Sequence, residues 1–160
     1  MQAGYSELKL ELCILYELAE SSVEYGGGIS RQCNIDVMLK SYSRDLPVRL
    51  DAMKISQVLR NLLNNAINHT DNGQSVSVDI IDHTPSICVK ITNPGEEISK
   101  EQLEQIWERY QRVQHQGGRK EGTGIGLAIV STILEAHGFE YGADYSVGHI
   151  SFWFDATQKD

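Results

Sequence analysis

The sequence has few of the residues that mark secreted, fibrous or disordered chains. Its 160 residues include only three cysteines, three prolines and 8% aromatic residues. Cys13, Cys33 and Cys88 are odd in number and widely spaced, so we expect reduced core thiols, which favours the cytoplasm. With 41% hydrophobic and 22% charged residues, the composition excludes collagen-like and low-complexity classes and predicts one globular core.

Basic charge and long apolar runs are also scarce. Fourteen Lys and Arg residues stand against 22 Asp and Glu residues, and the formal charge of −8 disfavours a nucleic-acid partner. The apolar runs 125–130 and 131–134 are too short to cross a bilayer, and no basic-then-apolar leader opens the chain. We therefore expect no secretion and no membrane contact by this chain.

Hydrophobic periodicity predicts a mixed series of helices and strands. Helical spacing predicts helices over 8–24, 52–70, 99–110 and 126–137. Alternating or short apolar runs predict strands over 34–40, 48–51, 76–80, 87–91, 139–145 and 149–155. Hairpins rather than regular βαβ crossovers predict an α+β fold, a two-layer sandwich in which a mixed, mostly antiparallel sheet packs on helices.

Three asparagines share one stripe of the helix predicted over 52–70. Asn61, Asn65 and Asn68 are spaced i, i+4, i+7, roughly opposite the buried leucines. Amide oxygens ligate hard cations such as Mg²⁺, and amide NH₂ groups donate to phosphate or ribose oxygens. The stripe is therefore either a nucleotide and metal site or a solvated face that is rich in asparagine.

A second cluster is the glycine-rich run Gly122-Thr-Gly-Ile-Gly126, which opens an apolar helix. Glycines let the backbone approach a ligand closely, and the free N–H groups at a helix start attract anions. Neither the strand before a Rossmann glycine run nor the Gly-Lys-Ser/Thr of a P-loop is present. By itself the run indicates either a phosphate site or an ordinary entry turn.

In combination and in this order, the segments resemble the nucleotide site of the GHKL ATP-binding superfamily, and specifically that of sensor histidine kinases. Residues 57–70 are similar to the N box of this family, and residues 91–98 and 122–127 to its two glycine boxes. Residues 106–112 are similar to its F box. The resemblance covers about residues 5–155. It implies a Bergerat fold, ATP and Mg²⁺ as cofactors, and transfer of the γ-phosphate to a histidine on a separate dimerisation domain of a two-component sensor.

The resemblance also implies residue roles. The catalytic pair is Asn65, which binds Mg²⁺ through its amide oxygen, and Asn61, which supports it. Asn93 faces the adenine amine, and Gly95 leaves room for the base. The other residues expected to bind ATP belong to an apolar slot, a phosphate-binding lid and the adenine edge. They are Asn68, His69, Ile98, Tyr110, Arg112, Lys120, Gly122, Thr123, Gly124, Ile125, Gly126, Leu127 and Ser151.

Three positions depart from the family's pattern. Asn93 replaces the usual Asp, Glu97 stands where the first glycine box often has its second Gly, and Asn68 stands where a basic residue is common. One alternative is therefore an ATP-binding regulatory module without kinase activity, and another is a serine-directed anti-sigma-factor kinase of the same superfamily. ATPases of the superfamily usually place Glu at the position of Asn61. An amide has no useful basicity, so Asn61 favours phosphotransfer over hydrolysis.

The resemblance also implies what lies outside the catalytic domain. In this family the phosphoacceptor histidine precedes the ATP domain on a helical hairpin, whereas the earliest histidine here is His69, inside the N box. Residues 1–10 resemble the end of that hairpin, and 11–160 resemble the ATP-binding catalytic domain. The expected partners are the protein's own dimerisation and phosphoacceptor domain and a response regulator, on the cytoplasmic side of an inner-membrane sensor.

Overall fold

The computed structural model describes residues 8–25, 34–42, 47–107 and 124–157. The main sheet is built from β2 (Asp36–Ser41), β4 (Ser75–His83), β5 (Ser86–Pro94), β6 (Glu140–Ser146) and β7 (His149–Thr157). Its strand order is β2-β4-β5-β7-β6. β2 runs parallel to β4, and every other neighbouring pair is antiparallel. The predicted sandwich with a mixed, mostly antiparallel sheet is confirmed.

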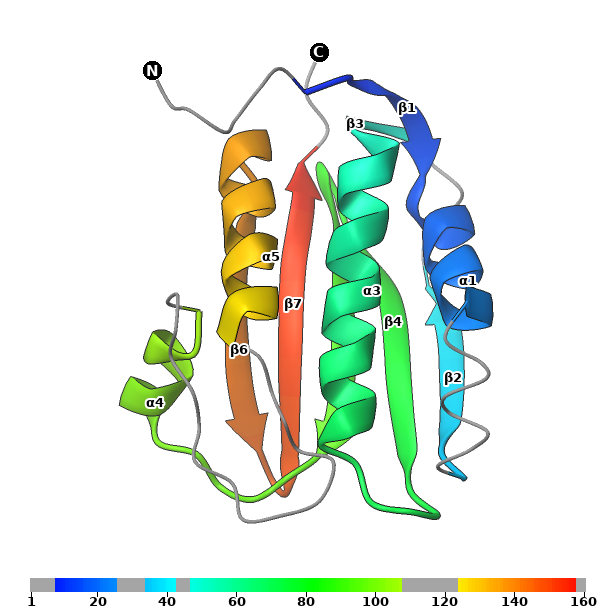
Figure 1. Ribbon diagram of the computed structural model, residues 1–160. Coiled ribbons are helices and arrows are strands. Elements are labelled where there is room, and N and C mark those ends of the chain that lie inside the picture. Colours follow the sequence, from blue (N-terminus) through cyan, green and yellow to red (C-terminus); the bar gives the residue numbers. More distant parts are fainter. Residues whose placement is uncertain (1–7, 26–33, 43–46, 108–123, 158–160) are drawn as a thin grey trace.

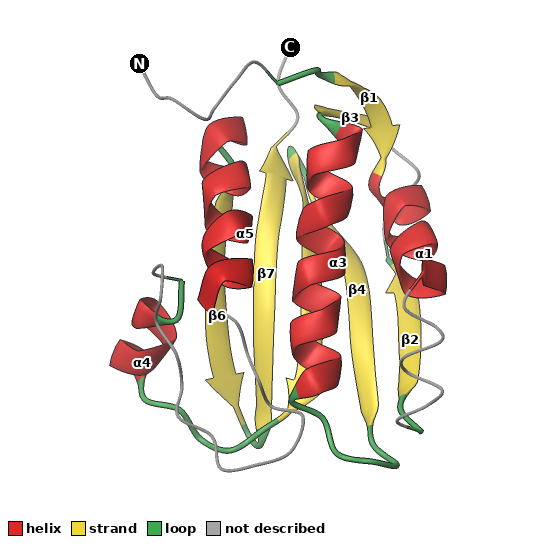
Figure 2. Ribbon diagram, in the orientation of Figure 1, coloured by secondary structure: helices red, strands yellow, loops and turns green. Residues whose placement is uncertain are grey.

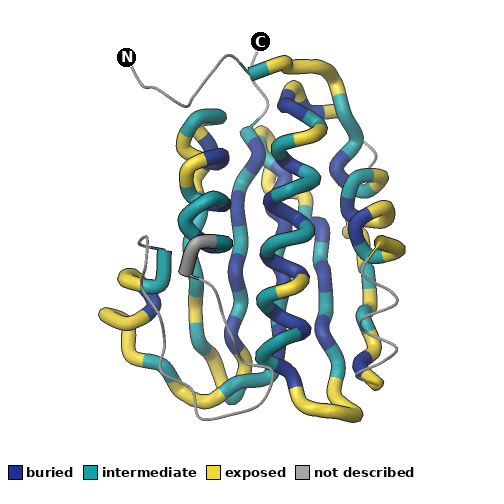
Figure 3. The backbone as a smooth tube through the Cα atoms, viewed as in Figure 1, coloured by how far each residue is buried: buried dark blue, intermediate teal, exposed yellow. Residues whose placement is uncertain are grey.

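Three helices cover one face of this sheet (Figures 1 and 2). They are α1 (Leu15–Tyr25), α3 (Ala52–Asn68) and α5 (Gly124–His137), and the short α4 (Lys100–Gln105) lies beside β6. Figure 3 shows the buried residues running along the inner sides of the helices and the central strands. The stripe predicted for α3 is buried at every position, namely Ile55, Val58, Leu59, Leu62, Leu63, Ala66 and Ile67.

The prediction of a helix over 8–24 is wrong in its first part. Residues Glu11–Ile14 form a strand, β1, which pairs antiparallel with β3 (Pro47–Leu50), and α1 begins only at Leu15. Apolar residues at Leu8, Leu10, Leu12 and Ile14 also alternate with a period of two. The edge of β3 offers backbone hydrogen bonds to such a strand, so pairing with β3 decided between the two periodicities.

The ends of the helices follow from local side-chain chemistry. Asp51 caps α3 by accepting a hydrogen bond from the backbone N–H of Lys54 at 3.1 Å. Ser99 and Gln102 form a capping box at the start of α4, which ends earlier than the predicted helix 99–110, at Gln105. Gly138 follows α5 with a φ of +75°, a conformation that favours glycine. Among the helices in the described ranges, none has the length and hydrophobicity of a membrane span.

Candidate functional site

The asparagine stripe of α3 borders the protein interior. Asn61, Asn65 and Asn68 are each half-buried, whereas their neighbour Asn64 is exposed. The buried leucines and isoleucines on the other side of α3 fix the rotation of the helix, and thereby the direction of the stripe. Three carboxamides are thus held on one partly covered surface, where each offers an amide oxygen and an NH₂ group.

Asn61 joins α3 to the start of α5. Its Nδ2 donates a hydrogen bond to the backbone carbonyl of Gly126 at 3.4 Å, across 65 residues of sequence. Gly126 lies in the first turn of α5, where backbone N–H groups lack helical partners and attract anions. The structure therefore brings together two of the segments that the sequence assigned to one site.

His69 marks the end of α3. Its ring Nδ1 donates to the backbone carbonyl of Asn65 at 2.8 Å, which fixes the orientation of the half-buried imidazole. The buried Thr70 donates from its hydroxyl to the carbonyl of Ala66 at 2.6 Å. The end of α3 is therefore rigidly closed, with His69 beside the last residues of the asparagine stripe.

Asn93 lies at the same end of the molecule as the end of α3, because β5 runs towards that end (Figure 1). Its side chain is 2% exposed, and its Nδ2 donates to the backbone carbonyl of Pro94 at 2.6 Å. Only the NH₂ group can face a carbonyl oxygen at that distance, so the amide has one orientation. In the register of β5 and β7, Asn93 pairs with Ile150.

Gly95 packs closely against the side chain of Ile150. A Cβ atom built on it would lie 2.6 Å from Cδ1 and 3.2 Å from Cγ1 of Ile150. Its backbone N–H donates to the carbonyl of Gly148 at 2.9 Å, which ties the end of β5 to the turn before β7. The glycine therefore accommodates Ile150, a residue that the sequence reasoning did not place at the site.

Ser151 faces away from Asn93. Paired residues of antiparallel strands lie on the same face, and successive residues alternate between faces. Ser151 pairs with Thr92, and their hydroxyl oxygens are 2.8 Å apart. Ile150 and Phe152 share the helix-covered face with Asn93, so the structure does not bring Ser151 together with the other predicted residues.

Two apolar residues predicted to line the base occupy different surroundings. Leu127 is buried in α5, as part of the core. Ile98 is half-buried and lines an open cleft of about 640 Å³ between α4 and β6. Among the described residues, neither Asn93 nor Gly95 lines this cleft. Its other lining residues are Glu97, Lys100, Leu103, Glu104, Trp107, Tyr141, Gly142, Ala143, Asp144 and Tyr145.

Aromatic rings close the inner side of this cleft. Trp107 packs edge-on against Tyr141, with ring centroids 4.9 Å apart, and against Phe152 at 5.4 Å. Burial, followed by a hydrogen bond to the Glu135 carboxylate, raises the pKa of Tyr141 to about 12. The phenol is therefore a neutral donor at ordinary pH. The alternation within 139–145 indicated that Tyr141 faces the core, but nothing in the sequence placed Trp107 against it.

The predicted lid residues lie outside the described residues. These are Tyr110, Arg112, Lys120, Gly122 and Thr123. Gly124 and Ile125 form the first residues of α5. Of the predicted set, the structure thus gathers the asparagines and His69 of α3, the start of α5 and the end of β5 at one end of the sandwich (Figure 1). Amides beside a helix start can hold phosphate oxygens and a hard cation.

Sequence comparison identifies a protein family and several known proteins that are similar to this chain. The family model for histidine kinase-, DNA gyrase B- and HSP90-like ATPases matches residues 50–158. The probable sensor kinase SilS of Salmonella typhimurium is 38% identical over 102 residues, 63% of this chain and 20% of SilS. Sensor histidine kinase WalK of Bacillus subtilis (strain 168) is 32% identical over 119 residues, 72% of this chain and 20% of WalK. The chain spans about a fifth of the length of these curated relatives.

Solved structures agree in fold. The nucleotide-free catalytic domain of histidine kinase ThkA has a TM-score of 0.85 and 26% identity, covering 94% of this chain and 97% of that chain. Full-length ShkA, solved with AMPPNP, has a TM-score of 0.83 and 22% identity over 98% of this chain and 33% of that chain, which shows the fold alone. ThkA has also been solved in complex with the response regulator protein TrrA, with a TM-score of 0.80 and 25% identity over 94% of this chain and 42% of that chain.

Proposed function

The chain belongs to the family of histidine kinase-, DNA gyrase B- and HSP90-like ATPases, and we propose that in its parent protein it phosphorylates a histidine. It is an ATP-binding catalytic domain of the sensor histidine kinase type. The observation that best supports the proposal is the hydrogen bond from Asn61 to Gly126, because it links the asparagine helix to the start of the glycine-rich helix. Phosphate binding needs both.

The amide oxygens of the asparagines on α3 are suitable ligands for Mg²⁺. Amide oxygens are ligands that this hard cation accepts, together with water and phosphate oxygens. We assign Asn65 as the Mg²⁺ ligand and Asn61 as the residue that holds α5 in place beside it, with Asn68 donating towards the phosphates or ribose. When bound, Mg²⁺ supplies charge neutralisation on the phosphates. Backbone N–H groups from Gly122 to Gly126 provide the remaining contacts to the phosphate oxygens in this proposal.

The adenine end is assigned to the end of β5. The NH₂ group of Asn93 is engaged with Pro94, so its Oδ1 is the atom suited to accept from the adenine amine. His69, held at the end of α3, borders the base. Ile98, Ile125 and Leu127 provide apolar contacts, and Tyr110, Arg112 and Lys120 act from the lid in this assignment. Ser151 has no support from its position, since it faces the other side of the sheet.

The chemistry of Asn61 favours transfer to a partner domain over hydrolysis. Asn61 stands where superfamily ATPases usually have Glu, and an amide cannot activate water as a general base. We propose residues 1–10 as the end of a phosphoacceptor hairpin and 11–160 as the catalytic domain. The proposed partners are that hairpin and a response regulator, as ThkA is solved with TrrA. We propose the cytoplasmic side of a membrane-anchored sensor as its location.

A reconstituted transfer reaction tests the proposal. The chain is mixed with the separately purified dimerisation hairpin of its parent protein and with ATP labelled at the γ-phosphate. We expect acid-labile, base-stable phosphate on the hairpin and none on the chain alone. Asn65→Ala should abolish the transfer, whereas the matched control Asn64→Ala, at an exposed position, should preserve it.

Two outcomes of the same reaction would contradict the proposal. ATP binding without any transfer to the hairpin would identify a regulatory module, which the departures at Asn93, Glu97 and Asn68 allow. Acid-stable phosphate on a serine of an added protein substrate, with an unlabelled hairpin, would instead identify a serine-directed kinase of the same superfamily.

A further inference from the structure

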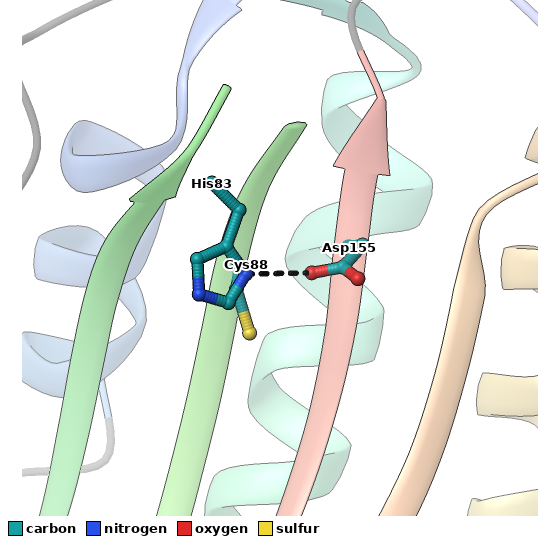
Figure 4. A group of neighbouring side chains, drawn as sticks. All are labelled: His83, Cys88 and Asp155. Carbon is teal, nitrogen blue, oxygen red and sulfur yellow. Dashed lines mark ion pairs between the residues drawn. The ribbon is translucent and has the colours of Figure 1, made fainter. Parts of the chain in front are cut away.

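A cluster of three metal-ligating side chains lies on the sheet face that the helices leave open. His83 ends β4, Cys88 lies near the start of β5, and Asp155 lies near the end of β7. Cys88 pairs directly with Asp155 and with Ile81, and His83 is two residues beyond Ile81, so the three side chains share one face. Figure 4 shows the imidazole, the thiol and the carboxylate converging from three adjacent strands.

The distances suit a single small cation. The possible ligand atoms of the three residues all lie within 4.8 Å of one another, and His83 Nδ1 is 3.8 Å from Asp155 Oδ1. Ligand atoms about 2.0–2.3 Å from a tetrahedral Zn²⁺ are separated from each other by roughly 3.3–3.8 Å. Cys88 and Asp155 are fixed by strand pairing, while the side chain of His83 is 55% exposed and can turn inward by the small distance needed.

The Asp155 carboxylate at this cluster has only weak partners, the thiol of Cys88 and an ion pair with His83 at 3.8 Å. Asp155 Oδ1 is buried, and no nitrogen or oxygen donor among the described residues hydrogen-bonds to it. A buried carboxylate oxygen without a strong hydrogen-bond donor is costly, and such atoms in native proteins commonly bind an ion or an ordered water. A cation held between Asp155, His83 and Cys88 would satisfy this oxygen and bridge the β4–β5 hairpin to β7.

The ligand types select the metal. Thiolate and imidazole favour a borderline-soft cation such as Zn²⁺, whereas Mg²⁺ prefers oxygen ligands alone. Asn93 is five positions beyond Cys88 along β5, which is about 17 Å of extended strand. The cluster is therefore far from the proposed nucleotide site and on the other face of the sheet, so it does not serve the metal of ATP.

We propose that His83, Cys88 and Asp155 form a Zn²⁺ site with three protein ligands and a fourth position open to water. On binding, the thiol of Cys88 loses its proton to solvent and coordinates as a thiolate, alongside a neutral imidazole and the carboxylate. Burial, followed by the charge of Asp155, raises the pKa of the metal-free Cys88 thiol to about 12.

The experiment is a competition titration of Zn²⁺ between the chain and a chromophoric chelator, repeated with Co²⁺ as a spectroscopic probe. We expect one Zn²⁺ per chain and a thiolate-to-cobalt charge-transfer band. His83→Ala and Cys88→Ser should each weaken Zn²⁺ binding by at least about tenfold, and Cys88→Ser should remove the band. His83 is exposed, so its variant keeps the proposal testable if Cys88→Ser fails to fold.

Matched controls use the chain's other cysteine and histidine positions. Cys13→Ser alters the half-buried free thiol of β1, and His149→Ala alters an exposed histidine at the opposite end of β7. Both should bind Zn²⁺ as the wild type does, and Mg²⁺ should not compete. The proposal is overturned if the wild type binds no Zn²⁺, if the cobalt band persists in Cys88→Ser, or if His83→Ala binds Zn²⁺ as tightly as His149→Ala.

Discussion

At the scale of single residues, Asn93 shows how a neighbour restricts a polar side chain. A free amide could accept from adenine or, after a flip, donate to guanine, so the sequence alone left its selectivity open. In the structure the NH₂ group is held on the carbonyl of Pro94 at 2.6 Å, in a site that is 2% exposed. With the NH₂ group held on Pro94, the oxygen points away from that carbonyl and can accept a hydrogen bond, which favours an adenine amine.

Replacing Asn93 by aspartate should destabilise the fold. Asn93→Asp removes the donor and sets a buried carboxylate against the Pro94 carbonyl, so we expect a loss of about 1–3 kcal/mol at pH 7. The loss should shrink in acid, because a protonated carboxyl can donate again. Urea unfolding at pH 7 and pH 5 measures both effects. Asn64→Asp, at an exposed site, is the control, and an equal unfolding free energy for the two variants would contradict the expectation.

Ser151 and Ile150 show which part of the site the sequence could not predict. The alternation over 149–155 correctly predicts a strand and two faces. It does not reveal which face meets Asn93, because that depends on the register between β5 and β7. The pairing of Asn93 with Ile150 decides it, and a shift of one residue would have placed Ser151 at the site instead.

At the scale of elements, a histidine links the end of α5 to the start of α3. The backbone N–H of Asp51 donates to His137 Nε2 at 3.0 Å, and His137 Nδ1 donates to the carbonyl of Ile133 at 2.9 Å. Only a neutral ring makes both bonds. Burial lowers the pKa of His137 and outweighs two effects that raise it, the hydrogen bond to Ile133 and the Asp51 carboxylate, while Lys54 acts in the same direction as burial.

This contact should make the stability depend on pH. The pKa of His137 is lowered in the fold from 6.5, so between the two values the unfolded chain binds more protons. Its contribution is complete above about pH 6.5 and is lost as the pH falls below that value. In His137→Gln, we expect lower stability at pH 8 and a shallower decline towards pH 5, measured by urea unfolding. His149→Ala should keep the wild-type slope, and an unchanged slope in His137→Gln would exclude this role.

The turn between β6 and β7 carries strain that an ordinary substitution can relieve. Val147 and Gly148 both have positive φ, +45° and +80°, as a type I′ hairpin turn requires. Valine is poorly suited to this conformation, and its side chain is 88% exposed, so it gains little from packing.

Val147→Asn should therefore stabilise the protein by about 1 kcal/mol, because Asn tolerates the left-handed region. Thermal unfolding measures the gain. The β-branched control Val147→Thr should match the wild type. If Asn and Thr gave the same midpoint, strain at this position would not contribute to stability.

The elements differ in how far their sequences determined them. α3, β4 and β5 were predicted because each follows a single hydrophobic period along its length. β1 was missed because residues 8–14 fit both the period of a strand and the spacing of a helix. Pairing with a distant strand, β3, decides which of the two forms. Local patterns predict such short segments poorly when tertiary pairing decides between them.

At the scale of the whole molecule, segments that lie far apart in the sequence come together at one end of the α/β sandwich. The contact between Asn61 and Gly126 spans 65 residues, and no periodicity in the chain predicts it. The resemblance to a family supplied that arrangement, and the structure contains it. The C-terminal ends of α3 and β5 lie at this end of the sandwich. The cluster of His83, Cys88 and Asp155 lies at the opposite end, on the sheet face that the helices leave open.

Calorimetric titration of ATP, with and without Mg²⁺, is the most direct test that this end of the sandwich is the nucleotide site. The wild type should bind ATP in a Mg²⁺-dependent manner, at micromolar to near-millimolar strength. Asn65→Ala should bind at least about tenfold more weakly, which corresponds to ~1.4 kcal/mol, and the exposed Asn64→Ala should match the wild type. If Asn65→Ala and Asn64→Ala bound ATP equally tightly in saturating Mg²⁺, the assignment of the asparagine stripe as the Mg²⁺ and nucleotide site would be contradicted.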